Sequence, residues 1–223
     1  MLLPIFFRLE VSGLENVPPA PYILASNHQA WFDSLFLVTV FPRRPMIYTM
    51  AKRETVFNTW WKRALVPRFG VFPISPAMGE LDEQGARSVY QVLHRGGVVT
   101  IFPEGRYSRG TRLRPLKKGV AHFALQAGVP ICPVAITGLD RFRLFGRVSI
   151  SIGPPIRPDP PATWAPQRRI FRLLDSLRRG ILRAFGRPSS SEEQASERLL
   201  ARLRVRLRRL LRTRASAGFT PAG

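Results

Sequence analysis

The chain has 223 residues, of which 45% are hydrophobic and 22% charged, a composition typical of a folded protein and not of a disordered one. This length suits one well-packed domain with an appendage. The formal net charge of +21 predicts a polyanionic partner, either nucleic acid or an anionic membrane surface. The single cysteine, Cys132, excludes an internal disulfide and is typical of a reducing compartment. No cysteine or histidine pair has zinc-ligand spacing, so the sequence predicts no metal site.

The sequence shows neither a secretory signal nor a membrane span. The apolar start at residues 1–7 is too short for a signal core and lacks a basic leader. No uninterrupted apolar stretch approaches the roughly 20 residues that cross a bilayer. We therefore expect a protein that is soluble or peripheral to a membrane.

Short apolar strands and helical patterns alternate as far as residue 152. This alternation predicts an α/β fold, in which a layered, mixed and partly parallel sheet is flanked by helices. The strands are expected at 22–26, 46–49, 70–74, 98–102, 131–137 and 148–152, and the helices at 34–41, 55–66, 82–93 and 117–127.

A proline-rich break at 159–161 divides the chain into an α/β domain (1–160) and a basic amphipathic helical tail (161–223). Residues 163–223 carry 15 basic and four acidic residues, which is +11 of the total charge. The first tail helix is expected at 166–185. Its apolar side consists of Ile170, Phe171, Leu174, Leu177, Ile181 and Phe185.

A second tail helix opens with a capping box at 191–194. Its six leucines fall within an arc of about 120° and arginines fill the remaining circumference. This pattern is typical of a helix that lies on an anionic bilayer, and it fits equally a helix that docks on the domain with solvated arginines. Trp60 and Trp61, beside two basic residues, offer another membrane contact, although one of the pair can instead belong to the core.

The most informative local pattern is a histidine followed by an aspartate five residues later. His28 and Asp33 come directly after the apolar run 22–25, which is typical of a buried strand. A histidine oriented by a carboxylate is a general-base arrangement that can activate a hydroxyl. Asp33 can also cap the helix that is expected to begin near Ser34.

A second polar block, Phe102-Pro103-Glu104-Gly105, also follows an apolar strand. Glu104 and Gly105 are compatible with a simple turn, but the end of a buried strand is a costly place for a charge without a function. Since ligands bind at the strand ends of open α/β sheets, we expect both blocks to form one site.

Together, these motifs resemble the glycerolipid acyltransferase family. The order and rough spacing of Asn27-His28-x4-Asp33 (the HX4D motif), the Phe102–Gly105 block and the run 129–134 match that family. The sequences at 11–18, 51–54 and 116–119 match as well. The likeness covers about residues 8–153 and leaves the tail outside.

The resemblance implies acyl transfer from acyl-CoA or acyl-carrier protein, as co-substrate, to a lysophospholipid, with 1-acylglycerol-3-phosphate as the expected acceptor. No bound cofactor is implied. His28 would deprotonate the attacking hydroxyl and Asp33 would orient the imidazole. The substrate-binding residues implied are Asn27, Gln29, Trp31, Lys52, Glu104, Gly105, Arg106, Ser108 and Lys117.

Two departures from the family pattern affect recognition of the acceptor. Where members often carry an arginine after the strand at 70–74, this chain has Pro76. The family's Glu-Gly-Thr-Arg-Ser is here Glu-Gly-Arg-Tyr-Ser, so that the arginine moves to Arg106 and Tyr107 takes its place. Phosphate recognition either uses Arg106, Arg109 and Lys117 or is altered because the acceptor is another lysolipid.

Two other functions fit parts of the sequence. The charge alone also suits a nucleic-acid-binding protein, but no zinc-finger, RNP or basic-zipper pattern occurs, so the sequence disfavours nucleic acid. A non-catalytic membrane-binding scaffold with the same fold is the second rival, and the intact His28, Asp33 and Glu104 argue against it. The expected location is peripheral, at the cytoplasmic face of the cell membrane.

Overall fold

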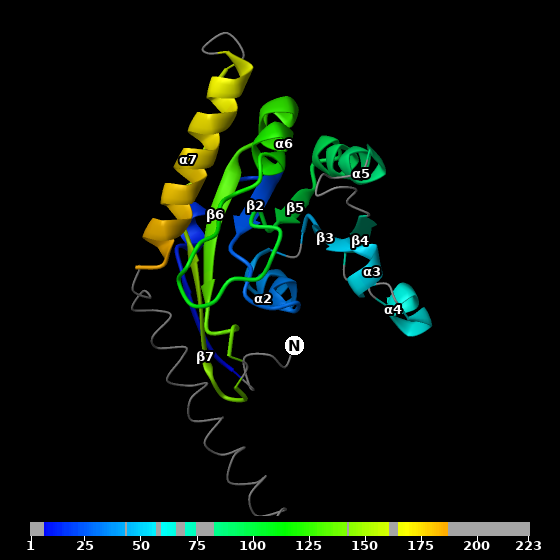
Figure 1. Cartoon of the computed structure of the whole chain (residues 1–223), viewed down its shortest axis with the longest axis vertical. Coiled ribbons are helices and arrows are strands. Elements are labelled where there is room, and N and C mark those ends of the chain that lie inside the picture. The colour runs from blue at the N-terminus through cyan, green and yellow to red at the C-terminus, as the bar shows by residue number, and fades with distance from the viewer. Residues whose placement is uncertain are drawn as a thin grey trace, which may run out of the picture.

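The computed structural model describes residues 7–42, 44–56, 59–65, 70–74, 83–141, 143–160 and 165–186, and in these ranges seven strands form one sheet (Figure 1). The strands are β1 (Arg8–Ser12), β2 (Tyr22–Ser26), β3 (Ile47–Lys52), β4 (Val71–Ile74), β5 (Val98–Ile101), β6 (Ile131–Thr137) and β7 (Arg147–Ile152).

The sheet is mixed and mostly parallel. Its order is β1-β7-β6-β2-β5-β3-β4, and every neighbouring pair is parallel except β6 with β7. β1 and β7 therefore run opposite to the other five strands. The predicted α/β fold with a partly parallel sheet is confirmed.

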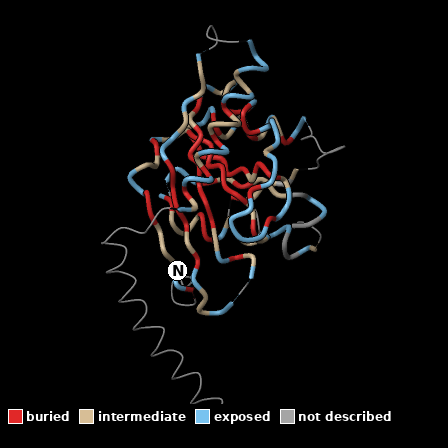
Figure 2. Tube along the Cα trace, turned by 60° about the vertical axis from the view of Figure 1, so that its left-hand side comes forward, coloured by how far each residue is buried: buried red, intermediate tan, exposed pale blue. Residues whose placement is uncertain are grey.

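Helices cover both faces of the sheet. Strand β2 alternates its side chains: Ile23 and Ala25 join the core cluster with α5, α6 and α7, whereas Tyr22 and Leu24 join the cluster with α2. Figure 2 shows the buried residues gathered in the interior of the trace, with exposed residues around them. The helices are α2 (Asp33–Val40), α3 (Arg53–Val56), α4 (Trp60–Leu65), α5 (Glu83–His94), α6 (Gly119–Ala127) and α7 (Pro166–Ala184), with a short 3-10 turn η1 (Leu14–Asn16).

Most predicted elements differ from the observed ones by one to three residues at their ends. The edge strand β1 is an exception, because it has no counterpart among the predicted strands. The helix predicted at 55–66 was wrong as one element, since the chain forms the separate helices α3 and α4 there. The helix predicted from Lys117 begins at Gly119, with Lys118 as its N-cap.

Helix α7 packs against β6 and α6 (Figure 1). Leu173, Leu177 and Ile181 are almost fully buried, and each contributes about 1.5–3 kcal/mol of hydrophobic stabilisation. The predicted apolar side was wrong at Phe171, which is 72% exposed because it lies about 200° around the helix from Leu173. The domain boundary at 160 stays a prediction, although α7 shares the core of the preceding domain.

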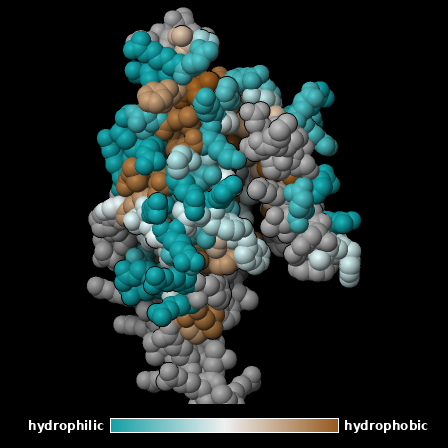
Figure 3. Space-filling view, in the orientation of Figure 1, coloured by the Kyte–Doolittle hydropathy of each residue, from teal (hydrophilic) through white to brown (hydrophobic). Residues whose placement is uncertain are grey.

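In the described ranges no helix is both long and apolar enough to cross a bilayer. The face of the molecule shown in Figure 3 is mostly hydrophilic, with a few apolar patches. Two tryptophans are strongly exposed, Trp31 by 69% and Trp60 by 81%. The Trp61 side chain and the second tail helix predicted from residue 191 lie outside the described part of the chain.

Candidate active site

The two polar blocks meet at one edge of the sheet. Strands β2 and β5 are parallel neighbours, with Ala25 paired to Ile101, so the residues that follow them emerge side by side. The backbone N–H of His28 donates to Glu104 Oε1 at 3.0 Å. The expectation that the two blocks form one cluster is confirmed.

His28 and Asp33 form a hydrogen-bonded pair. Nδ1 of His28 lies 2.7 Å from Asp33 Oδ2. Because an ionised carboxylate only accepts, this bond places the ring proton on Nδ1 and leaves the Nε2 lone pair available as a base. The His28 side chain is 18% exposed while that of Asp33 is fully buried, so the imidazole can be reached from outside and its partner cannot.

The chain around the pair fixes the aspartate. Asp33 Oδ2 also accepts the backbone N–H of Gln29 at 2.6 Å, and both carboxylate oxygens lie 3.0 Å from the N–H of Ala30. These donors precede α2, and the helix's N-cap is Phe32 with no side-chain cap. Asp33 therefore holds the loop that carries His28, and the alternative that it caps α2 was wrong.

Aromatic rings hold the imidazole on two sides. The Phe102 ring stacks on it with centroids 4.0 Å apart, and the Tyr107 ring meets it edge-on at 4.4 Å. Partial burial, with the nearby Asp33 charge, raises the pKa of the Tyr107 hydroxyl above its ordinary value. Tyr107 is thus neutral at physiological pH and 47% exposed, which places a phenol at the mouth of the site.

Glu104 links the histidine to the loop that follows β5. Its side chain is buried, and Oε1 accepts both the His28 N–H and the Ser108 hydroxyl, the latter at 3.2 Å. Oε2 accepts the backbone N–H of Arg114 at 2.7 Å. Since its hydrogen bonds join the His28 backbone to Ser108 and Arg114, the carboxylate positions the loop 105–114 relative to His28.

The amides of Asn27 and Gln29 bind the protein itself. Asn27 exchanges two hydrogen bonds with the backbone of Ile136 in β6, at 2.9 and 2.7 Å. Gln29 donates to the Gly110 carbonyl at 2.8 Å and accepts the Leu139 N–H at 3.0 Å. Both side chains are buried, so they tie the loop that carries His28 to its neighbours; direct contact with substrate stays a prediction for them.

The other predicted substrate-binding residues lie in the loop after β5, on the exposed surface or at the end of β3. Gly105, at φ +65°, sits under Lys117, since a Cβ there would lie 2.7 Å from Lys117 Cε. Ser108 is buried, its N–H donating to the His28 carbonyl at 2.6 Å, whereas Arg106 and Trp31 are exposed. Lys52 closes β3 at the same sheet edge, and its side chain lies outside the described part.

Comparison with known proteins decides the family. The family described as Acyltransferase matches residues 8–137, which is more than half of the chain. This chain belongs to the acyltransferase family. The family assignment made from the motifs is confirmed.

The chain is similar to proteins named 1-acyl-sn-glycerol-3-phosphate acyltransferase. It is 29% identical to the alpha form of Bos taurus over 80% of this chain and 63% of that protein. It is 32% identical to the Pseudomonas aeruginosa protein over 57% of this chain and 49% of that protein. The chain thus spans less than two thirds of the length of these curated relatives.

A solved structure has the same fold. The crystal structure of the 1-acyl-sn-glycerophosphate (LPA) acyltransferase PlsC from Thermotoga maritima superposes with a TM-score of 0.61. The alignment covers 82% of this chain and 74% of the other at 23% identity. The mixed sheet flanked by helices is therefore an arrangement that the two proteins share.

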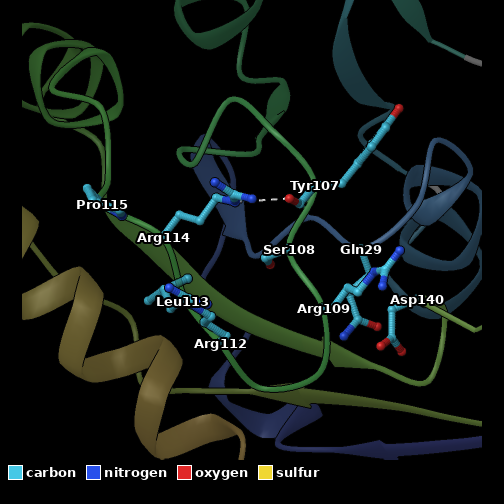
Figure 4. Close-up of a pocket in the computed structure, with 9 residues that line it drawn as sticks. All are labelled: Gln29, Tyr107, Ser108, Arg109, Arg112, Leu113, Arg114, Pro115 and Asp140. Carbon is cyan, nitrogen blue, oxygen red and sulfur yellow. Dashed lines mark hydrogen bonds between the residues drawn. The ribbon is translucent and has the colours of Figure 1, made fainter.

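A cavity of about 590 Å³ opens beside this candidate site (Figure 4). Three arginines line it: Arg109, Arg112 and Arg114. Sequence reasoning considered Arg109 for phosphate recognition but did not single out Arg112, Arg114 or the lining residue Asp140. The only sequence signal for the two arginines was the density of arginine between residues 106 and 114, which does not reveal the path of the loop in space.

Proposed function

We propose that this chain transfers a fatty acyl group from acyl-CoA or acyl-carrier protein to the free hydroxyl of a lysophospholipid, in the first place 1-acylglycerol-3-phosphate. Phosphatidic acid would be the product. The observation that carries the proposal is the 2.7 Å contact between His28 Nδ1 and Asp33 Oδ2, with the imidazole partly exposed. The names of the similar proteins support this acceptor.

In the proposed reaction the acceptor oxygen attacks the thioester carbonyl carbon while His28 Nε2 takes the hydroxyl proton. Asp33 stabilises the imidazolium that forms. The tetrahedral intermediate collapses with cleavage of the carbon–sulfur bond. The leaving thiolate then recovers the proton from His28, so that an ester and a free thiol are the products.

Direct attack is favoured over an acyl-enzyme intermediate. Cys132 is fully buried, and burial raises the pKa of its thiol from 9.0 to about 12, which keeps it protonated and inaccessible. The Ser108 hydroxyl lies 3.2 Å from Glu104 Oε1 and 3.3 Å from the His28 carbonyl. Neither side chain is activated by the imidazole, so the substrate hydroxyl is the nucleophile in this proposal.

A second candidate keeps the chemistry and changes the acceptor. Tyr107 stands at the position of the arginine in the family's Glu-Gly-Thr-Arg-Ser motif, edge-on to His28. A neutral phenol can hydrogen-bond a headgroup but supplies no positive charge for a phosphate. This substitution favours another lysolipid, such as a lyso-aminolipid, as the alternative acceptor.

The acyltransferase would work as a peripheral protein at the cytoplasmic face of the membrane. The positive charge and the exposed Trp31 and Trp60 suit an anionic bilayer surface, where tryptophan side chains favour the headgroup level. Sedimentation with anionic liposomes tests this for the wild type, for Trp60→Ser and for a chain without residues 187–223. Unchanged binding by the shortened chain would exclude a membrane role for that segment.

Acyl transfer from a labelled long-chain acyl-CoA, and from the matching acyl-carrier protein, to a panel of lysolipids tests the proposed reaction. The wild type is compared with His28→Ala, and circular dichroism shows whether both are folded. Product from 1-acylglycerol-3-phosphate that vanishes in His28→Ala supports the first candidate. Product from another lysolipid alone supports the second, and no product from any pair of substrates refutes both.

A further inference from the structure

The arginine-lined cavity lies between the loop 105–115 and the segment that follows β6. Its volume of about 590 Å³ is within the usual range for small-molecule sites, about 300–1,000 Å³. In Figure 4, Arg109 lies close to Gln29 and Asp140, and Arg112 and Arg114 stand on the other side. The cavity therefore presents guanidinium groups from one loop around a space beside the general base.

Hydrogen bonds hold this loop in place at several points. The Gly110 N–H donates to Asp140 Oδ2 at 3.0 Å, and its carbonyl accepts from Gln29 at 2.8 Å. Arg114 donates its backbone N–H to Glu104, and its Nε donates to the Tyr107 carbonyl at 3.0 Å. Since Glu104 also holds the His28 backbone, the cavity and the base share one support. Such a preorganised wall loses little conformational entropy when it binds a ligand.

The cavity has an excess of positive charge. It contains three guanidinium groups and one carboxylate, that of Asp140. Within the ranges that the structure describes, the ion pairs found do not involve Arg109 or Arg112. Both guanidinium groups can thus take an external anion. Arginine presents a planar fork of donors that matches the oxygens of a phosphate.

The proposed substrates carry phosphate groups, so the proposed reaction calls for a cationic group near His28. The ring that meets His28 edge-on is that of Tyr107, a neutral phenol that supplies no positive charge for a phosphate. Arg106, the residue before Tyr107, is exposed and is not among the residues that line the cavity. Three arginines nearby, on a loop fixed to the catalytic histidine, provide the missing charge at a different place.

We propose that the cavity formed by Arg109, Arg112 and Arg114 binds a phosphate group of one of the two substrates. The phosphate belongs either to the lysophospholipid headgroup or to the phosphopantetheine arm that carries the acyl thioester. This proposal rests on the proposed acyl transfer, and it adds to it a phosphate site on the loop 105–115.

The test variant is the double substitution Arg109→Gln/Arg112→Gln, because both side chains are exposed. The matched control is Arg95→Gln/Arg178→Gln. It removes the same charge from exposed positions outside the cavity, at the end of α5 and on α7. Thermal melting checks that both variants remain folded, and the single change Arg112→Gln replaces the double one if the latter melts early.

The kinetic readout is the KM for each substrate, measured at saturating concentration of the other. Loss of a hydrogen bond to a charged group weakens binding by about tenfold or more, so one KM should rise by that factor with little change in kcat. A higher KM for the lysolipid identifies its headgroup phosphate, and a higher KM for the acyl donor identifies the phosphopantetheine. Both KM values equal to those of the control would overturn the proposal.

A binding measurement separates failure of this proposal from failure of the acyl transfer itself. Titration calorimetry with coenzyme A and with sn-glycerol 3-phosphate needs no turnover. At least one of these probes should bind the wild type and the control about tenfold more tightly than the cavity variant. If both probes bind the cavity variant as tightly as the wild type and the control, the cavity is not a phosphate site, whether or not the protein is active. If a probe does distinguish them while no acyl transfer occurs, only the proposed reaction fails.

Discussion

Replacing Asp33 by asparagine isolates the role of the carboxylate, because the side chain keeps its shape and loses its charge. In the wild type, Oδ2 accepts from His28 Nδ1, Gln29 N and Ala30 N, and Oδ1 accepts from Ala30 N. An amide offers one oxygen for these donors. If that oxygen takes the place of Oδ2, the NH₂ group faces the Ala30 N–H; if it takes the place of Oδ1, the NH₂ group faces His28 and Gln29.

Each arrangement has a calculable consequence. A buried donor left without an acceptor lowers the free energy of unfolding by about 1–3 kcal/mol, so Asp33→Asn should be destabilised by roughly that amount. In the second arrangement the NH₂ group donates to Nδ1 of His28, which favours the tautomer with its proton on Nε2. In that tautomer Nε2 has no free lone pair and cannot act as a base. The same change in a serine-protease triad lowers kcat by about 10⁴, and general-base catalysis is typically worth 10²–10⁴. We expect a decrease in kcat of about 10²–10⁴ for Asp33→Asn.

The assay is a double-mutant cycle of Asp33→Asn and His28→Ala. Since Asp33 acts through the imidazole, its substitution should slow the wild type strongly and the His28→Ala protein hardly at all. Thermal melts of all four proteins separate lost stability from lost rate. Rate losses that multiply in the double variant, or a near-normal kcat for Asp33→Asn, would refute the coupling between the two residues.

Three further predictions concern the surroundings of the site. Glu104→Gln should lower the free energy of unfolding by about 1–3 kcal/mol and reduce kcat, because its NH₂ group would face either the His28 N–H or the Arg114 N–H; a normal melt and rate would contradict this. Gly105→Ala should lower the free energy of unfolding by about 1–2 kcal/mol, because Gly105 has a positive φ. It should also raise the KM for the acceptor, because the added Cβ displaces Lys117. A variant as stable as the wild type, or more stable, would contradict the strain, since Gly→Ala at an unstrained site tends to stabilise. Between pH 9.0 and about 12 the unfolded chain has lost the Cys132 thiol proton, whereas the folded protein retains it. The free energy of unfolding should therefore fall with rising pH, and more steeply in the wild type than in Cys132→Ala. Equal slopes in alkaline denaturant titrations would show that the thiol is not linked to unfolding.

The sequence predicted the parts of this site that depend on local patterns. His28 and Glu104 each follow a buried apolar run, and the alternation of strands with helices indicates an at least partly parallel sheet. Because neighbouring parallel strands end at the same edge, these two facts suffice to bring both residues together. The hydrogen bond between the His28 N–H and Glu104 follows from the pairing of Ala25 with Ile101.

The positions of other residues depend on long-range contacts that no local pattern encodes. Gln29 belongs to the same motif as His28, but its amide forms hydrogen bonds with Gly110 and Leu139, about 80 and 110 residues away. The arginines that line the cavity are brought there by the path of a loop without regular structure. The sequence showed that they were numerous but not that three of them converge.

The register of α7 was predicted only approximately for a related reason. An amphipathic helix presents a broad apolar arc, and the partner surface decides which part of it is buried. Here the β6 and α6 surface selects Leu173, Leu177 and Ile181, which leaves Phe171 in solvent. Phe171→Ser should accordingly change stability far less than Leu177→Ala, for which loss of a buried leucine removes about 2–5 kcal/mol.

The role of His28 as a general base in direct transfer is tested most directly by separating the acyl donor from the acceptor in time. The protein, at a concentration comparable to that of the donor, is mixed with labelled acyl-CoA or acyl-carrier protein, whichever of the two proves active. After a delay the lysolipid acceptor is added. Label on the denatured protein and in the lipid product is then followed for the wild type and His28→Ala. We predict no labelled protein before the acceptor is added, rapid formation of product by the wild type, and a rate lower by about 10²–10⁴ for His28→Ala. An acyl-protein that passes its label to the acceptor, or near-normal product formation by His28→Ala, would contradict this mechanism.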